Sequence, residues 1–230
     1  MPIADLGDVQ LNYTLRGPTD APAVVFAHAL GTDQSIWDAV INALPENLRI
    51  LTFDMRGHGA SLVPDAPYSM GTLIRDAERL MEVYEIRDSL FVGLSIGGMI
   101  AQGLAVKRLD LIRALVLSNT AAKIGTPEIW ARRMDAVRAN GLNAILDDTM
   151  QRWFPRRYLQ SGAHLATQRR VQKTPVEGYL GCCAAIAGTD FYTPTSGLRL
   201  PVLGIAGSDD GSTPPDLVRE TTDLIPGSQF

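Results

Sequence analysis

The stretch Phe91-Val92-Gly93-Leu94-Ser95-Ile96-Gly97-Gly98 joins an apolar strand pattern to the start of a helical pattern. Residues 93–97 have the form G-x-S-x-G, in which the serine occupies a strained turn between a strand and a helix. Glycine on both sides of the serine allows the neighbouring backbones to pass closely. The context therefore predicts Ser95 as a nucleophile, with its oxygen at the carboxyl edge of a sheet.

Short apolar runs of similar length occur on both sides of this motif. Each is apolar on both alternating faces, which is typical of parallel strands covered by helices. The runs are residues 23–27, 50–53, 89–94, 114–117 and 202–205. Amphipathic helical patterns at residues 73–84 and 97–106 lie between them. The alternation predicts an α/β fold, with a mostly parallel central sheet and helices on both faces.

Two segments differ from this pattern. Residues 9–16 alternate apolar and polar side chains, which predicts an edge strand with one solvent-exposed face. Residues 121–197 show helical periodicity and no convincing strand, which predicts a helical lid. The expected organisation is therefore a core formed by residues 1–120 and 198–230, interrupted by the lid.

Composition limits the classes of partner. The 230 residues are 46% apolar and 20% charged, with a net charge of -4, so a folded chain without a nucleic-acid surface is expected. No apolar run is long enough for a bilayer and no secretory segment begins the chain, which predicts a cytoplasmic protein acting on a small molecule. Cys182 and Cys183 are adjacent, and we expect reduced, buried thiols without a catalytic role.

Acyl transfer at a serine also needs donors for the developing oxyanion. Residues 28–33 follow the strand at 23–27, so the backbone amides of Leu30 and Ile96 are the predicted donors. His28 is expected to support this loop by hydrogen bonding. The glycine-rich turn at residues 54–61 is expected to be locked by internal hydrogen bonds, with contact to an anionic ligand as the alternative.

A carboxylate is expected after the last strand of the pattern, where it would orient a histidine base. Asp210 is the predicted acid and Asp209 is the alternative. Where the nucleophilic serine precedes the acid along the chain, as here, the histidine is expected to follow the acid. His28, His58 and His164 all precede Asp210.

Two explanations account for the absent histidine. The chain is expected to be truncated, without its last strand, a histidine loop and a closing helix, because the strand at residues 202–205 would otherwise be an exposed edge. The alternative is a complete chain, for which loss of the base should lower turnover by about 10⁴-fold or more.

Several segments together resemble the 3-oxoadipate enol-lactonases of the β-ketoadipate pathway, within the α/β-hydrolase superfamily. The resemblance covers essentially the whole chain and includes segments in or beside the lid. These segments are residues 28–33, 37–38, 54–61, 93–99, 119–125, 152–154 and 181–186. The family pattern places the acid at Asp210. It implies hydrolysis of a carboxylate-bearing enol-lactone to 3-oxoadipate through an acyl-enzyme, in aromatic-compound catabolism, with neither metal nor organic cofactor.

A substrate carboxylate requires a nearby cation, and apolar rings can line the pocket. The candidates in the lid are Trp130, Arg133, Arg152 and Trp153. Two other functions remain open. One is a different carboxylesterase or cofactor-free perhydrolase of the same fold. The other is a non-catalytic binding protein, which only the absent histidine favours.

Overall fold

The computed structural model describes residues 2–230, and a seven-stranded sheet with the order β1-β2-β4-β3-β5-β6-β7 forms its centre. The strands are β1 (Ile3–Asp5), β2 (Gln10–Arg16), β3 (Ala23–Ala27), β4 (Arg49–Phe53), β5 (Ser89–Leu94), β6 (Ile112–Ser118) and β7 (Val202–Ile205). The pairs β1–β2 and β2–β4 are antiparallel, and the remaining pairs are parallel. The predicted mostly parallel sheet is confirmed.

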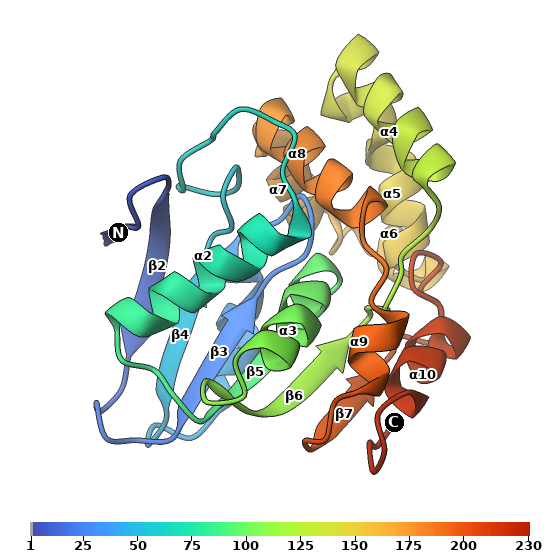
Figure 1. The fold of residues 1–230 in the computed structure, drawn as a ribbon. Coiled ribbons are helices and arrows are strands. Elements are labelled where there is room, and N and C mark those ends of the chain that lie inside the picture. Colours follow the sequence, from blue (N-terminus) through green and yellow to red (C-terminus); the bar gives the residue numbers. More distant parts are fainter. Residues whose placement is uncertain (1) are drawn as a thin grey trace.

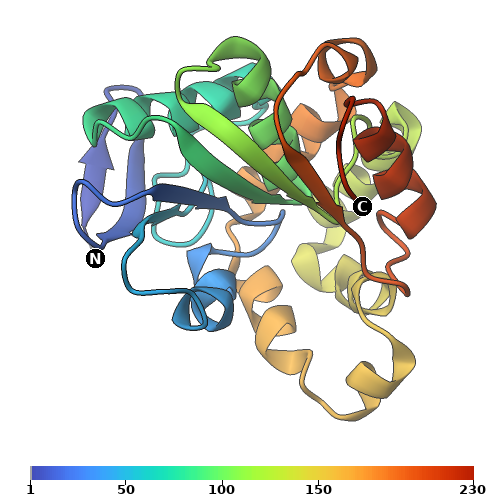
Figure 2. The same ribbon diagram turned by 90° about the horizontal axis from the view of Figure 1, so that it is seen from below.

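Helices follow most of the strands and cover the sheet. They are η1 (Gln34–Trp37), α1 (Asp38–Asn42), α2 (Met70–Val83), α3 (Ile96–Lys107), α4 (Pro127–Asn140), η2 (Leu142–Ile145), α5 (Leu146–Trp153), α6 (Arg156–Gln160), α7 (Leu165–Lys173), α8 (Val176–Ala187), α9 (Tyr192–Ser196) and α10 (Pro215–Asp223). Helices α2 and α3 lie on one face and α1 on the other (Figure 2). Among residues 2–230, no helix is both long and apolar enough to cross a bilayer.

Strand β3 shows why the central strands are apolar at every position. Val25 and Ala27 enter the larger core beneath α2 and α3, whereas Val24 and Phe26 enter a smaller core with Trp37. The rings of Phe26 and Trp37 lie 5.0 Å apart. Because successive side chains point to opposite faces, burial on both faces requires a continuous apolar run.

Helices α4 to α8 lie beyond the carboxyl ends of the parallel strands (Figure 1). Residues 121–197 form helices and connecting loops between β6 and β7, as the periodicity predicts. The division into a core and a lid domain stays a prediction.

The segment after α10 pairs with the outer side of β7. Gln229 N donates to Val202 O at 2.8 Å, and Gly204 N donates to Gln229 O at 2.7 Å, in parallel register. Strand β7 is therefore hydrogen-bonded on both sides at this point.

The prediction that residues 9–16 form an edge strand is wrong. Strand β2 lies between β1 and β4, and the short strand Ile3–Asp5 forms the edge. Three residues give too little alternation to be recognised from sequence.

The turn at residues 54–61 is locked by internal hydrogen bonds, which favours the structural interpretation over an anion site. Asp54 Oδ2 accepts from Ala60 N at 2.9 Å, and Ser61 Oγ donates to Asp54 O at 2.7 Å. Arg56 donates to both carboxylate oxygens of Asp76, each at 2.6 Å. The side chains of this pair are only 6% and 3% exposed, so α2 is anchored to the turn.

Loss of Asp76 should be costly, because the buried guanidinium would lose its buried counter-charge and keep only the exposed Asp8, at 3.2 Å. We expect Asp76→Asn to lower the free energy of unfolding by about 3 kcal/mol. The matched control is Asp135→Asn, which breaks the exposed pair with Arg138 and should cost less than about 0.5 kcal/mol. Urea denaturation measures both values, and equal losses would contradict the structural role of the turn.

Candidate active site

Ser95 lies between the last residue of β5 and the first residue of α3. Its backbone is left-handed, with φ 56° and ψ −120°. Such a conformation costs a non-glycine residue about 1–3 kcal/mol and persists only when surrounding contacts enforce it. Here Ser95 N donates to Ser118 O at 3.1 Å, and Ser95 O accepts from Thr120 Oγ1 at 2.7 Å. Ser95 remains partly exposed to solvent.

The glycines beside Ser95 are required by close backbone approaches. A Cβ atom on Gly93 would lie 2.3 Å from Gly97 O, and one on Gly97 would lie 2.3 Å from Ala27 O. Both distances are far inside van der Waals contact. The expectation that glycine is needed on both sides of Ser95 is therefore confirmed.

The predicted oxyanion donors come from the loop after β3 and from the start of α3. Ile96 is the first residue of α3, so its amide has no partner within the helix. Leu30 lies in the loop after β3, which contacts the first turn of α3 at Gly97. Neither amide donates a hydrogen bond to an acceptor among residues 2–230. The geometry thus leaves both amides free to bind an anionic oxygen.

His28 and His58 hold the loop that carries Leu30. Met55 N donates to His28 Nε2 at 2.9 Å, and Gly31 N donates to His58 Nε2 at 3.0 Å. Burial lowers the pKa of His28, and burial together with the neighbouring His28 lowers the pKa of His58 to about 3. Both rings are therefore neutral supports, as expected for His28.

Asp210 lies in the loop between β7 and α10, and its carboxylate accepts four hydrogen bonds. Asp210 Oδ1 accepts from Ser212 N at 2.7 Å and from Thr213 N at 3.0 Å. Asp210 Oδ2 accepts from Thr213 Oγ1 at 3.2 Å and from Asn119 Nδ2 at 2.5 Å. The alternative acid, Asp209, is exposed and forms no side-chain hydrogen bond within the described residues. The geometry favours Asp210 as the fixed carboxylate.

Asn119 is a site residue that the sequence analysis did not assign. Asn119 follows β6 with a positive φ of 42°, and its backbone N donates to Ile205 O at 2.8 Å. Asparagine is one of the few residues that readily adopt this conformation. An asparagine directly after a strand was the available signal, but its contact with Asp210 depends on the pairing of β6 with β7.

None of the histidines in residues 2–230 hydrogen-bonds to Ser95 or to Asp210. His28 and His58 are committed to the loop contacts described above, and His164 lies at the start of α7. The base of a triad is thus not assigned to any of these three residues.

Of the four lid residues predicted to contact substrate, Arg133 points inward. Arg133 Nε donates to Tyr179 Oη at 2.8 Å, and Arg133 Nη2 donates to Thr149 Oγ1 at 2.6 Å. No carboxylate lies within 4.0 Å of Arg133 among the described residues. The ring of Tyr179 also packs against Gly31, where an added Cβ would lie 3.1 Å from Tyr179 Cε2. Arg133 is therefore a half-buried cation with no carboxylate nearby, and the ring of Tyr179 separates it from the loop that carries Leu30.

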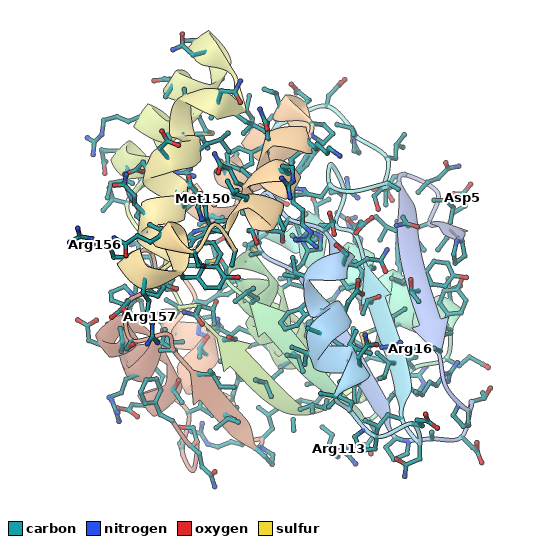
Figure 3. All side chains as sticks on the ribbon, turned by 180° about the vertical axis from the view of Figure 1, so that it is seen from behind. Asp5, Arg16, Arg113, Met150, Arg156 and Arg157 are labelled. Atoms are coloured by element: carbon teal, nitrogen blue, oxygen red, sulfur yellow. The ribbon has the colours of Figure 1, made fainter. Side chains whose placement is uncertain are left out.

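The other three predicted residues are used in lid structure. Arg152 pairs with Asp148 at 2.9 Å on the exposed side of α5. Trp130 Nε1 donates to Ile124 O at 2.6 Å. Trp153 packs against a small core that includes Met150, which lies where α5 faces α7 (Figure 3).

Cys182 and Cys183 are both buried in α8, as expected for packing residues. Burial raises the pKa of Cys182 well above its usual value and that of Cys183 to about 12. Both thiols therefore stay protonated near neutral pH.

The fold and the strained serine turn together define an α/β hydrolase. Residues 22–230 match the family model for the α/β-hydrolase fold. The chain belongs to this family. It is 34% identical to 3-oxoadipate enol-lactonase 2 of Acinetobacter baylyi over 208 residues, which cover 90% of this chain and 78% of that protein.

Solved structures give the same relationship. The crystal structure of the enol-lactonase from Burkholderia xenovorans LB400 superposes with a TM-score of 0.95 at 36% identity, covering 100% of this chain and 90% of that one. A hydrolase from Pseudomonas aeruginosa PA01 superposes with a TM-score of 0.94 at 31% identity, covering 99% and 88%. The predicted resemblance to enol-lactonases is thus confirmed.

The contact at Gly97 can be tested with a closely matched pair. Gly71 and Gly97 are each the second residue of a helix, but an added Cβ on Gly71 meets only Ser69 Oγ, at 3.8 Å. We expect Gly97→Ala to lower the free energy of unfolding by about 1–3 kcal/mol through overpacking. Gly71→Ala should instead raise it by up to about 1 kcal/mol. Thermal and urea denaturation distinguish these signs, and a neutral Gly97→Ala would contradict the close approach.

Proposed function

We propose that this protein is a serine hydrolase that opens a carboxylate-bearing enol-lactone, 3-oxoadipate enol-lactone, in aromatic-compound catabolism. The observation that carries the proposal is the enforced left-handed turn at Ser95, at the start of a helix whose first amide, Ile96 N, has no acceptor among the described residues. The likeness to enol-lactonases supports the choice of substrate.

In the proposed reaction Ser95 Oγ attacks the lactone carbonyl and transfers its proton to a base. The carbonyl oxygen becomes an oxyanion that accepts hydrogen bonds from Leu30 N and Ile96 N. Collapse breaks the ring C–O bond and leaves an acyl-enzyme, while the enol oxygen receives the proton and the enol converts to the ketone. Water then attacks the acyl group and releases the carboxylate and Ser95.

Asp210 is the proposed acid of this site, and the base that it orients is a histidine by the logic of the triad. Its contacts with Asn119 and with the amides of residues 212 and 213 keep the carboxylate in one orientation. A fixed carboxylate selects one tautomer of the imidazole and stabilises the imidazolium that forms during attack.

Arg133 is the proposed partner for the substrate carboxylate. Its hydrogen bonds to Tyr179 and Thr149 use two of its donors, so others remain for an anion. A guanidinium that has already been ordered by neutral groups binds a carboxylate with a smaller loss of side-chain entropy. Of the four predicted substrate contacts, Arg133 therefore has the strongest support.

Loss of the nucleophile is the direct test of the reaction. In the complete gene product, Ser95→Ala should lower turnover of the enol-lactone by about 10⁴-fold or more, because no oxygen remains to form the acyl-enzyme. Ser196→Ala, at an exposed position in α9, is the control and should keep normal turnover. Intact-mass analysis during turnover should detect an acyl adduct that Ser95→Ala lacks. Undiminished turnover in Ser95→Ala would refute the proposal.

Recognition of the carboxylate is tested separately with two neighbouring arginines. Arg133→Gln should raise KM for the free lactone about 10- to 100-fold and leave KM for its methyl ester nearly unchanged, because only the free acid needs the cation. Arg132→Gln, an exposed neighbour, should change neither value by more than about twofold. Equal losses on acid and ester would assign Arg133 a structural role only.

A further inference from the structure

A cavity lies between α7 and the loops that follow β3 and β4. Its volume is about 540 Å³, within the range of sites for small organic ligands. Ser95 is not among the residues that line it. Figure 2 shows the segment formed by η1 and α1 next to α7, and Arg170 Nε donates to Ser35 Oγ at 3.0 Å across this junction.

The α7 wall of the cavity is cationic. It presents Arg169, Arg170 and Lys173. Within residues 2–230 no carboxylate lies within 4.0 Å of Arg169 or Lys173, and Arg170 has only Asp33, at 3.8 Å. Residues 149–176 include six Lys and Arg and no Asp or Glu, although the whole chain has a net charge of -4. Arg169 and Lys173 therefore have no ion-pair partner among the described residues.

The opposite wall carries two carboxylates, and each of them already accepts hydrogen bonds from the protein. Asp33 Oδ1 accepts from Ser35 N at 2.9 Å. Asp54 Oδ1 accepts from Gln34 N at 2.8 Å, and Asp54 Oδ2 accepts from Ala60 N at 2.9 Å. With three cations against two carboxylates, the lining has an excess positive charge, and that excess lies on α7.

Gln34 adds a donor that the protein leaves unused. Gln34 Oε1 accepts from Thr52 Oγ1 at 2.7 Å, which orients the amide group. Gln34 Nε2 is buried and has no acceptor among the described residues. A buried donor without an acceptor costs about 1–3 kcal/mol, so an oxygen atom within the cavity would relieve that cost.

We propose that this cavity binds a small organic carboxylate that carries one further oxygen acceptor. The carboxylate is held by Arg169 and Lys173, and the further oxygen accepts from Gln34 Nε2. The site also adjoins the oxyanion loop, because Thr174 Oγ1 donates to Gly31 O at 3.1 Å. An occupied cavity would thus fasten α7 to the loop that carries Leu30. The binding itself is independent of the reaction proposed for Ser95.

The test is a titration of the protein with 4-oxopentanoate, followed by amide NMR. Saturable shifts are expected for the Gln34 side-chain amide and for Thr174, larger than those of Ile96 and Gly97. Pentanoate, which lacks the ketone, should bind about fivefold or more weakly, and inorganic phosphate should not reproduce the Gln34 shift. Shifts centred on Ile96 would place the ligand at Ser95 and overturn the proposal, as would the absence of saturation.

Two double variants, each of which removes two positive charges, test whether the carboxylate binds at specific side chains or responds only to the overall positive charge of the lid. Arg169→Gln with Lys173→Gln should weaken binding about tenfold or more, because both proposed partners of the carboxylate are lost. Arg156→Gln with Arg157→Gln removes two lid cations outside the cavity lining and should change affinity by less than about twofold. The four substituted positions are all exposed, so melting temperatures should stay unchanged. Equal weakening in the two double variants would overturn the proposal.

Discussion

The close contact between the first turn of α3 and the ends of β3 and β5 is the constraint on which the rest of the site depends. With Gly97 pressed against Ala27 O and Gly93 against Gly97 O, the chain has no room for a relaxed turn. Ser95 is therefore held in a left-handed conformation, with its carbonyl and amide both hydrogen-bonded to β6 and the loop after it. The strain is offset by the buried sheet and helices around it.

The same contact makes two backbone amides available. The helix start leaves Ile96 N unpaired, and neutral imidazoles hold the loop after β3 to the loop after β4. Because His28 and His58 accept hydrogen bonds from Met55 N and Gly31 N, they satisfy these two buried donors without adding a charge. Their burial, with lowered pKa values, is what keeps them neutral. The polar core beneath the loop is thus a support for the site rather than a part of its chemistry.

Strand pairing connects the remaining parts. Asn119 follows β6 and Asp210 follows β7, and the parallel pairing of these strands places the asparagine amide 2.5 Å from the carboxylate. On the lid side, Tyr179 lies between Gly31 and Arg133, so the inward-pointing guanidinium is positioned by a helix that is distant in sequence from both. The carboxyl edge of the sheet therefore collects groups from many segments, as is usual for ligand sites of α/β folds.

Local periodicity and glycine spacing were enough to predict the parallel strands, the serine turn between β5 and α3, and the helical character of residues 121–197. The sequence did not reveal that Ile3–Asp5 forms the edge strand, since three residues have no readable period. It also could not separate Arg133 from Arg152, or assign Asn119 to Asp210. Only the tertiary structure decided these points, because they depend on contacts between segments far apart in the chain, where burial and hydrogen-bond partners are set by packing rather than by local pattern.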